Sequence, residues 1–170
     1  MAVIATLGIL LSAPGQTMGI AVFADALIEV TGPTRTELSL VYMMGTITSA
    51  FFLIRAGRWF DVHGAWSALI ATSLMLGMSI LFLAMVDRAS EYVATLIGIN
   101  GSAIAFSLMV VGYFGVRFSG QGVMTSASRN LLLLWFERRR GLVSGVSGVF
   151  VSLGFSLAPS LLAMLIDGWQ

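Results

Sequence analysis

The stretch IRAGRWFDVHGAW, from Ile54 to Trp66, contains two arginines, an aspartate and the only histidine of the chain. It lies between two long apolar runs, which cover about residues 37–54 and 65–86. Apolar runs of this length, separated by a short polar segment, are typical of membrane helices joined at the membrane surface. The stretch therefore predicts a tight loop between two membrane-spanning helices.

The composition of the whole chain agrees with a membrane protein. Of its 170 residues, 58% are hydrophobic and 10% are charged, and the mean hydropathy is +0.96. Soluble domains carry about 25% charged residues. The net charge of +1 provides no large positive surface, so the lipid bilayer is the expected partner and nucleic acid is not. Because there is no cysteine, disulfides and thiolate metal sites are excluded.

Hydropathy divides residues 1–170 into five predicted spans within a single membrane domain. The first lacks the basic start of a signal peptide, and the last has about 25 residues, enough to cross a ~30 Å hydrocarbon core at ~1.5 Å per residue. The stretch from Asp87 to Ala103 could be an outer loop, an interfacial helix or an extension of a neighbouring span, and six spans remain an alternative. The predicted fold is an all-α polytopic membrane helix bundle with spans at about 3–30, 37–54, 65–86, 103–135 and 142–166.

Arginines near the predicted span ends indicate the orientation of the chain. Five of them follow the second and fourth spans, whereas only Arg35 and Arg88 lie at the opposite ends. Cytoplasmic loops carry the excess of basic residues. We therefore expect a multi-pass protein of the cell membrane, inner or plasma, with a cytoplasmic N-terminus. The five arginines are Arg55, Arg58, Arg138, Arg139 and Arg140.

Three motifs occur in an order that resembles the major facilitator superfamily. Gly57, Asp61 and Gly64 form G-x-x-x-D-x-x-G, which resembles the signature loop between the second and third helices of that family. RFSGQG (117–122) resembles its fourth-helix R-x-x-x-x-G pattern. WFERRRGLVSG (135–145) is similar to the loop before helix five, especially in the monocarboxylate and oxalate:formate branches, and DGWQ (167–170) resembles the turn before helix six.

The resemblance implies a fold of twelve helices in two six-helix halves, each built from inverted three-helix repeats. This chain would then be the N-terminal part of a transporter, a partial six-helix half whose partner is the missing C-terminal half. The resemblance also implies a conformational latch, in which Gly57 permits close approach of a helix from the other half and Asp61 caps that helix. Arg58 and Gly64 complete the predicted latch. Alternatively, Asp61 only caps the third span in a solvated turn.

Polar residues inside the predicted spans are the candidates for substrate binding, because unpaired polar groups are costly in a membrane. Tyr113, Arg117 and Gln121 recur every four residues and therefore share one helical stripe with Thr125. Gln16 lies beside Pro14, whose ring weakens the first span. Gln16 and Arg117 each lie 14 residues, about 21 Å, from the predicted outer surface and could share one site.

Other polar residues of the spans complete the list of candidates. Thr46 belongs to a polar stripe of the second span, with Ser39, Tyr42 and Ser49. Asp25 is a possible proton carrier, although it lies near the outer end of the first span. Structural roles, such as bonds to backbone carbonyls, remain the alternative for Gln16 and Arg117.

An enzyme is not expected. GVSG (145–148) imitates the motif of intramembrane serine proteases, but those need a histidine at membrane depth, and His63 lies in the predicted loop. Asp61 has no partner carboxylate there, so no metal and no cofactor is predicted. The expected function is secondary transport of a small solute by alternating access, driven by a proton gradient. Arg117 favours an organic anion such as a monocarboxylate, because a guanidinium can bind a carboxylate through two hydrogen bonds. Efflux of drug-like compounds, or a non-transporting assembly or regulatory module, remains the alternative.

Overall fold

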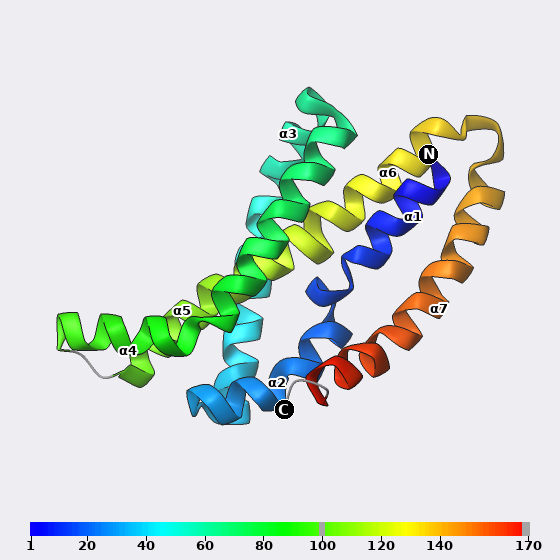
Figure 1. Cartoon of the computed structure of the whole chain (residues 1–170). Helices are drawn as coiled ribbons and strands as arrows, with labels where there is room; N and C mark the ends of the chain where they lie inside the picture. The colour runs from blue at the N-terminus through cyan, green and yellow to red at the C-terminus, as the bar shows by residue number, and fades with distance from the viewer. Residues whose placement is uncertain (99–100, 168–170) are drawn as a thin grey trace.

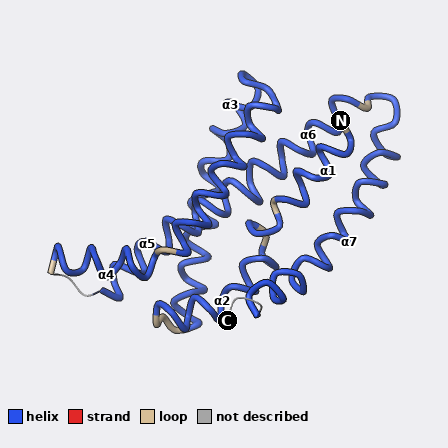
Figure 2. The backbone as a smooth tube through the Cα atoms, viewed as in Figure 1, coloured by secondary structure: helices blue, strands red, loops and turns tan. Residues whose placement is uncertain are grey.

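A computed structural model describes residues 1–98 and 101–167, which form only helices and the turns between them (Figures 1 and 2). The predicted all-helical class is therefore confirmed for this part of the chain. Residues 99 and 100 of the Asp87–Ala103 stretch, and residues 168–170 of DGWQ, lie outside the described residues. In chain order the elements are α1 (Ala2–Leu11), η1 (Ala13–Gly15), α2 (Thr17–Thr31), α3 (Arg35–Ala84), α4 (Val86–Ile97), α5 (Gly101–Val116), η2 (Arg117–Met124), α6 (Thr125–Trp135), η3 (Glu137–Arg139) and α7 (Arg140–Asp167).

Helix α3 consists of two arms that meet at Gly64. The first arm begins with a capping box, in which the Thr34 hydroxyl accepts from the Glu37 amide and the Glu37 carboxylate accepts from the Thr34 amide. The backbone leaves the helical conformation at Gly64, with φ 79° and ψ 168°. In Figure 1, α3 rises to its turn at the top and then descends to α4. Gly57 and Asp61 are helical, so the predicted loop is shorter than expected and is confined to Gly64.

The apolar segment predicted as one helix over residues 3–30 is interrupted between α1 and α2. Pro14 lies in the short 3₁₀ helix η1, and Gln16 is extended, with φ −80° and ψ 158°. Proline lacks an amide hydrogen, and in a continuing helix its ring would clash with the carbonyl one turn before it, so the chain must bend here. The Gly15 and Gln16 amides donate to the Ser12 and Ala13 carbonyls at 2.9 and 3.0 Å. The predicted bend is therefore a full break.

The stretch from Asp87 onward is helical where the structure describes it. Helix α4 covers Val86–Ile97 and ends at Gly98, which has the left-handed conformation that commonly terminates helices. Helix α4 packs against α5, and the two project together to the left of Figure 1. The described part of the stretch is therefore helical and not an irregular loop, and the choice between an interfacial helix and an extension of a neighbouring span stays a prediction.

Within residues 1–98 and 101–167, three helical stretches are long and apolar enough to cross a membrane: Arg35–Ala84, Gly101–Trp135 and Arg140–Leu165. The second is the rod formed by α5, η2 and α6. Helix α1 is apolar but shorter. The first stretch includes both arms of α3. The exact number of spans stays a prediction, because length and composition alone identify these helices.

Two hydrophobic clusters hold the helices together on either side of η2. One joins α1, the second arm of α3 and α6 through residues such as Ala5, Leu69 and Leu131. The other joins the first arm of α3 to α4 and α5 through Val41, Val86 and Met109. Helix α7 contacts α1 through a hydrogen bond between the Thr6 and Ser147 hydroxyls at 2.8 Å. Segment η2 lies between the two clusters and contacts α3, α5, α6 and η1.

Candidate functional site around Arg117

The central feature of the site is a π-helical segment, η2, which contains the RFSGQG motif. The Thr125 amide and hydroxyl both donate to the Gly120 carbonyl, five residues back, and the hydroxyl distance is 3.0 Å. Single π-helical turns within α-helices frequently occur at functional sites. The wider turn also alters the four-residue stripe that the sequence predicts for an ordinary α-helix.

The break in the first segment packs directly on this π-helical segment. A Cβ atom added at Gly15 would lie 2.7 Å from the Val116 carbonyl oxygen and 2.8 Å from the Gly120 Cα atom. A Cβ atom added at Gly120 would in turn lie 2.8 Å from the Gly15 Cα atom. Real Cβ atoms do not approach other atoms so closely, so both positions require glycine. This backbone contact brings residues 15–17 close to Arg117.

Arg117 is buried, with only 7% of its surface exposed. Its Nη1 atom lies 3.3 Å from the Gly15 carbonyl oxygen and 3.4 Å from the Thr17 hydroxyl. Both distances exceed the usual 2.7–3.2 Å of an N–H···O hydrogen bond, so these contacts are weak. Arg117 forms no ion pair with a described residue, and its Nε atom has no hydrogen-bond partner there. The guanidinium is therefore a buried charge with few partners.

An aromatic ring and a hydroxyl complete the surroundings of Arg117. The guanidinium carbon lies 4.9 Å from the centroid of the Tyr42 ring, which is within the range of a cation–π interaction. The Tyr42 hydroxyl is 2.9 Å from the Thr17 hydroxyl. Tyr42 also meets the Tyr113 ring edge to face, with centroids 6.4 Å apart. The first arm of α3 is thus linked to Arg117 and to the start of α2.

Gln16 is buried near Arg117 but bonds to other residues. Its Nε2 atom donates to the Ser12 and Thr125 hydroxyls, at 3.1 Å in both cases. The Ser12 hydroxyl donates in turn to the Ile9 carbonyl at 2.6 Å. Gln16 therefore links the Ser12 and Thr125 hydroxyls, and the bond to a backbone carbonyl freed by Pro14 is not among its described contacts. A direct role in substrate binding is an expectation that this geometry does not require.

Five buried side-chain polar atoms have no hydrogen-bond partner among the described residues. Such atoms are unusual, because most buried polar side-chain atoms in proteins are satisfied. Four of them belong to predicted site residues: Thr46 Oγ1, Tyr113 OH, Arg117 Nε and Gln121 Oε1. The fifth is Ser128 Oγ.

A small cavity of about 200 Å³ lies beside this cluster. Residues of α2, of the first arm of α3 and of α5 line it, among them Ile20, Ala21, Ala24 and Leu38. The lining residues that carry a hydroxyl group are Thr17, Ser39, Tyr42 and Tyr113. The cavity therefore offers space for a small polar molecule at the Tyr42 side of the site.

The predicted latch residues lie elsewhere, around the turn of α3. Gly57, Arg58, Asp61 and Gly64 are all exposed, and space around Gly57 and Gly64 is open. Asp61 has no hydrogen bond or ion pair with any described residue, so it caps no helix here. The only histidine, His63, stacks on Trp59 with ring centroids 4.6 Å apart. The capping bond of the alternative is therefore absent among the described residues, and the latch stays a prediction.

The side chain of Asp25 contacts Arg35 and not the residues around Arg117. Its carboxylate forms an ion pair with Arg35 at 2.8 Å, and both side chains are more than three-quarters exposed. Exposed ion pairs of this kind contribute little to stability, typically about 0–1 kcal/mol. The pair links α2 to the start of α3. Proton coupling through Asp25 therefore has no support from a buried position.

The described residues contain no group of three or more histidine, aspartate or glutamate side chains that could hold a metal ion. In comparisons with protein-family models, curated proteins and solved structures, nothing matches this chain. The part of the chain that the structure describes is therefore all-helical, with three stretches that could cross a membrane. Any more specific function must be argued from the residues around Arg117.

Sequence reasoning missed two contributors to this site. The sequence pattern puts Tyr42 on a polar stripe but does not place it against Arg117, and it does not mark Thr17 as a site residue. The repeated GQ dipeptide, in Gly15–Gln16 and Gly120–Gln121, marks the two segments that meet. A pair of glycines at the same depth in two spans is the signal that could have placed Thr17 beside Arg117.

Proposed function

We propose that this chain is the N-terminal part of a secondary transporter of the major facilitator type, and that it binds a small organic anion at Arg117. In this proposal the anion is a monocarboxylate, and transport occurs by alternating access with a second, C-terminal half. The order of the three sequence motifs supports the family. The surroundings of Arg117 support the substrate class.

The observation that carries the proposal is the poor pairing of a buried arginine. A buried charge is costly unless it is paired and hydrogen-bonded, and arginine keeps its charge in proteins. The Arg117 guanidinium has two long contacts through Nη1, an aromatic ring at 4.9 Å and a free Nε atom within the described chain. A carboxylate ligand would provide the missing negative charge and accept two parallel hydrogen bonds.

The neighbouring polar atoms supply a further argument. Thr46, Tyr113 and Gln121 each hold a buried oxygen without a partner. A carboxylate that also carries a hydroxyl or carbonyl group could satisfy some of them. The adjacent cavity of about 200 Å³ suits a molecule of only a few carbon atoms. We therefore expect short carboxylates to bind better than long or aromatic ones.

The test is ligand-induced thermal stabilisation of the purified chain in nanodiscs. A panel of short carboxylates is compared with their neutral amides, in wild type and in Arg117→Lys. Lysine keeps the charge but loses the planar pair of donors. Loss of one charge-assisted hydrogen bond costs about 1.5–3 kcal/mol, which corresponds to roughly 10- to 150-fold in affinity. We expect wild type to respond to carboxylates only, and Arg117→Lys to lose this response.

Arg129→Lys is the matched control, because Arg129 lies on the same rod but is exposed. It should retain the wild-type response. If Arg117→Lys responds like wild type, or if neutral amides stabilise equally, anion binding at Arg117 is wrong. If Arg117→Lys lowers the stability of the ligand-free chain and no carboxylate binds wild type, Arg117 is a structural charge. A non-transporting membrane module would then be the better interpretation.

A further inference from the structure

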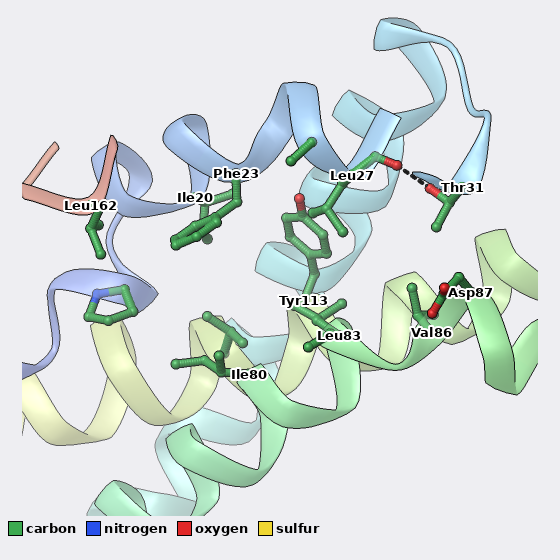
Figure 3. A pocket seen from close by; sticks show the side chains of 14 residues that line it. Ile20, Phe23, Leu27, Thr31, Ile80, Leu83, Val86, Asp87, Tyr113 and Leu162 are labelled. Atoms are coloured by element: carbon green, nitrogen blue, oxygen red, sulfur yellow. Dashed lines mark hydrogen bonds between the residues drawn. The ribbon is translucent and has the colours of Figure 1, made fainter. Parts of the chain in front are cut away.

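A second and larger cavity, of about 400 Å³, lies between α2, the second arm of α3, the start of α4, α5 and α7 (Figure 3). Its wall is mostly aliphatic, and it includes Phe23 and Leu27 from α2 and Ile80 and Leu83 from α3. Leu162 of α7 closes one end. Small-molecule sites typically have about 300–1,000 Å³ and are mainly apolar with a few polar groups. The cavity thus has the size and lining of a ligand site.

Two polar groups face this apolar wall. Tyr113 is 1% exposed, and its hydroxyl has no hydrogen-bond partner in the described residues. In Figure 3 the Tyr113 ring stands between α2 and Leu83, with its hydroxyl directed towards α2 between Phe23 and Leu27. The other lining hydroxyl, of Thr31, already has a partner, because it donates to the Leu27 carbonyl.

Asp87 supplies the second polar group and the only charge of the lining. It is half-buried and lies in the first turn of α4, where a carboxylate interacts favourably with the helix dipole. Its carboxylate forms no ion pair and no side-chain hydrogen bond with the described residues. In Figure 3 it lies at the end of the cavity opposite Leu162. An unpaired negative charge at the edge of an apolar cavity is complementary to a cation with an apolar body.

We propose that this cavity binds a hydrophobic cation, such as a tertiary amine or quaternary ammonium that carries an aromatic group. The apolar body occupies the space between Phe23, Ile80 and Leu83, and the cationic head lies at Asp87. The aromatic faces of Phe23 and Tyr113 contribute further attraction for a cation or an aromatic group. A lipid acyl chain or a fatty acid would fit the apolar wall but would gain nothing from Asp87.

This site is distinct from the anion site and does not depend on it. Arg117 does not line the large cavity, and the two cavities share only Ile20 and Tyr113. The charges that face the two sites are opposite in sign. Binding of a cation at Asp87 can therefore succeed or fail whatever the outcome for carboxylates at Arg117.

The test compares (4-phenylbutyl)trimethylammonium with its neutral isostere, in which a carbon atom replaces the nitrogen. Equilibrium dialysis measures the affinity of both compounds for the full chain in nanodiscs of zwitterionic lipid, with empty nanodiscs as the blank. We expect wild type to bind the cation at least about tenfold more tightly than the neutral compound. Asp87→Asn should lose about tenfold in cation affinity and leave the neutral compound unchanged.

Two further variants separate the cavity from a general surface effect. Ile80→Trp fills the cavity from a wall position that is 38% exposed, so the fold should tolerate it, and both compounds should lose affinity. Glu91→Gln removes the same charge from an exposed position of α4 outside the cavity and should change neither affinity. Arg117→Lys should leave cation binding within about twofold of wild type.

The proposal is overturned if the neutral isostere binds wild type as tightly as the cation, because the charge would then play no part. Undiminished cation binding in Asp87→Asn or in Ile80→Trp would overturn it equally. Binding of a fatty acid anion in preference to the cation would identify the cavity as an acyl-chain site instead.

Discussion

The two segments that most resemble family motifs, Gly57–Gly64 and Arg117–Met124, have opposite surroundings in this structure. Arg117–Met124 is a π-helical segment that contacts the Gly15 region and both arms of α3, and Arg117 is 7% exposed. Gly57–Gly64 lies at the exposed turn of α3, and Asp61 has no partner among the described residues. One motif is therefore explained by packing within the chain, and the other is not.

The two motifs resemble the family equally in sequence, but the structure accounts for their residues differently. The glycines around Arg117 are required by contacts that can be measured in this chain. At the α3 turn, only Gly64 has a local reason to be glycine, because its backbone conformation is open to glycine alone. Any role for Gly57 and Asp61 needs a surface that contacts the turn from outside the described chain.

The largest expected effect concerns the close contact between Gly15 and Gly120, beside Arg117. Gly120→Ala places a methyl group against the Gly15 backbone and the Leu76 side chain, so the helices must separate. Overpacking of this kind costs about 1–3 kcal/mol of stability. Gly57→Ala is the matched control, because it adds the same methyl group to a helical position with open space. It should be neutral or stabilising by up to about 1 kcal/mol.

The free energy of unfolding of both variants can be measured by denaturant titration in mild detergent. Equal stabilities for Gly120→Ala and Gly57→Ala would contradict the close contact between Gly15 and Gly120. The position of Thr17 beside Arg117 would then also be wrong.

A second prediction concerns the turn itself. Gly64→Ala should destabilise the chain by about 1–3 kcal/mol, because φ 79° with ψ 168° is a conformation that residues with a Cβ atom rarely adopt. The cause is backbone strain and not crowding, since nothing lies near the added methyl group. Thermal unfolding of Gly64→Ala and Gly57→Ala, measured in parallel, separates these causes. Similar melting temperatures would show that the turn at Gly64 is wrong.

The helices and their approximate ends could be predicted from hydropathy. The predicted segment over 65–86 corresponds to the second arm of α3, and the segment over 142–166 to α7. Hydropathy could not locate the break at Pro14 or the helical state of Gly57 and Asp61. Both depend on backbone geometry, which apolar composition does not encode: a proline within an apolar run can produce a kink or a full break.

The candidate site was predictable only in part. The cost of burying Arg117 singles it out from sequence alone, and the roles of Gln121 and Tyr113 beside it stay predictions of helical spacing. Tyr42 could not be placed against Arg117, because the rotation of one helix about its axis relative to another depends on packing. The π-helical turn further changes the register of η2 relative to an ideal helix. The pairing of Gln16 with Ser12 and Thr125 depends on the break and was equally out of reach.

The ring and hydroxyl of Tyr42 make separable contributions on the Arg117 side of the comparison. Tyr42→Phe removes the hydrogen bond to Thr17 at 2.9 Å and keeps the ring, so it should cost about 0.5–1.5 kcal/mol. Tyr42→Leu should cost about a further 0.5–2 kcal/mol through loss of the cation–π contact. Tyr92→Phe, in exposed α4, is the control. Unfolding free energies that rank the three variants otherwise would argue against the arrangement around Arg117.

The smallest effect is expected at Asp61, and it separates three interpretations of the α3 turn: a solvated turn, a helix cap and a latch. The carboxylate contacts no described residue, so Asp61→Ala should change the unfolding free energy of this chain by less than about 0.5 kcal/mol. If Asp61 instead caps the second arm of α3, the same substitution should cost about 0.5–2 kcal/mol, whereas Asp61→Asn should cost little because asparagine is an equally good cap.

A latch predicts a third pattern. Both substitutions leave the isolated chain unchanged, and in a transporter with both halves each weakens the closed arrangement by about 0.3–1 kcal/mol, since both lose the interaction of a negative charge with a helix dipole. Unfolding titrations of the chain distinguish the cap from the other two patterns, and distances between spin labels in the two halves detect the latch. Unchanged distance distributions in Asp61→Asn would leave the turn as a solvated one, with Gly64 as its only residue of structural consequence.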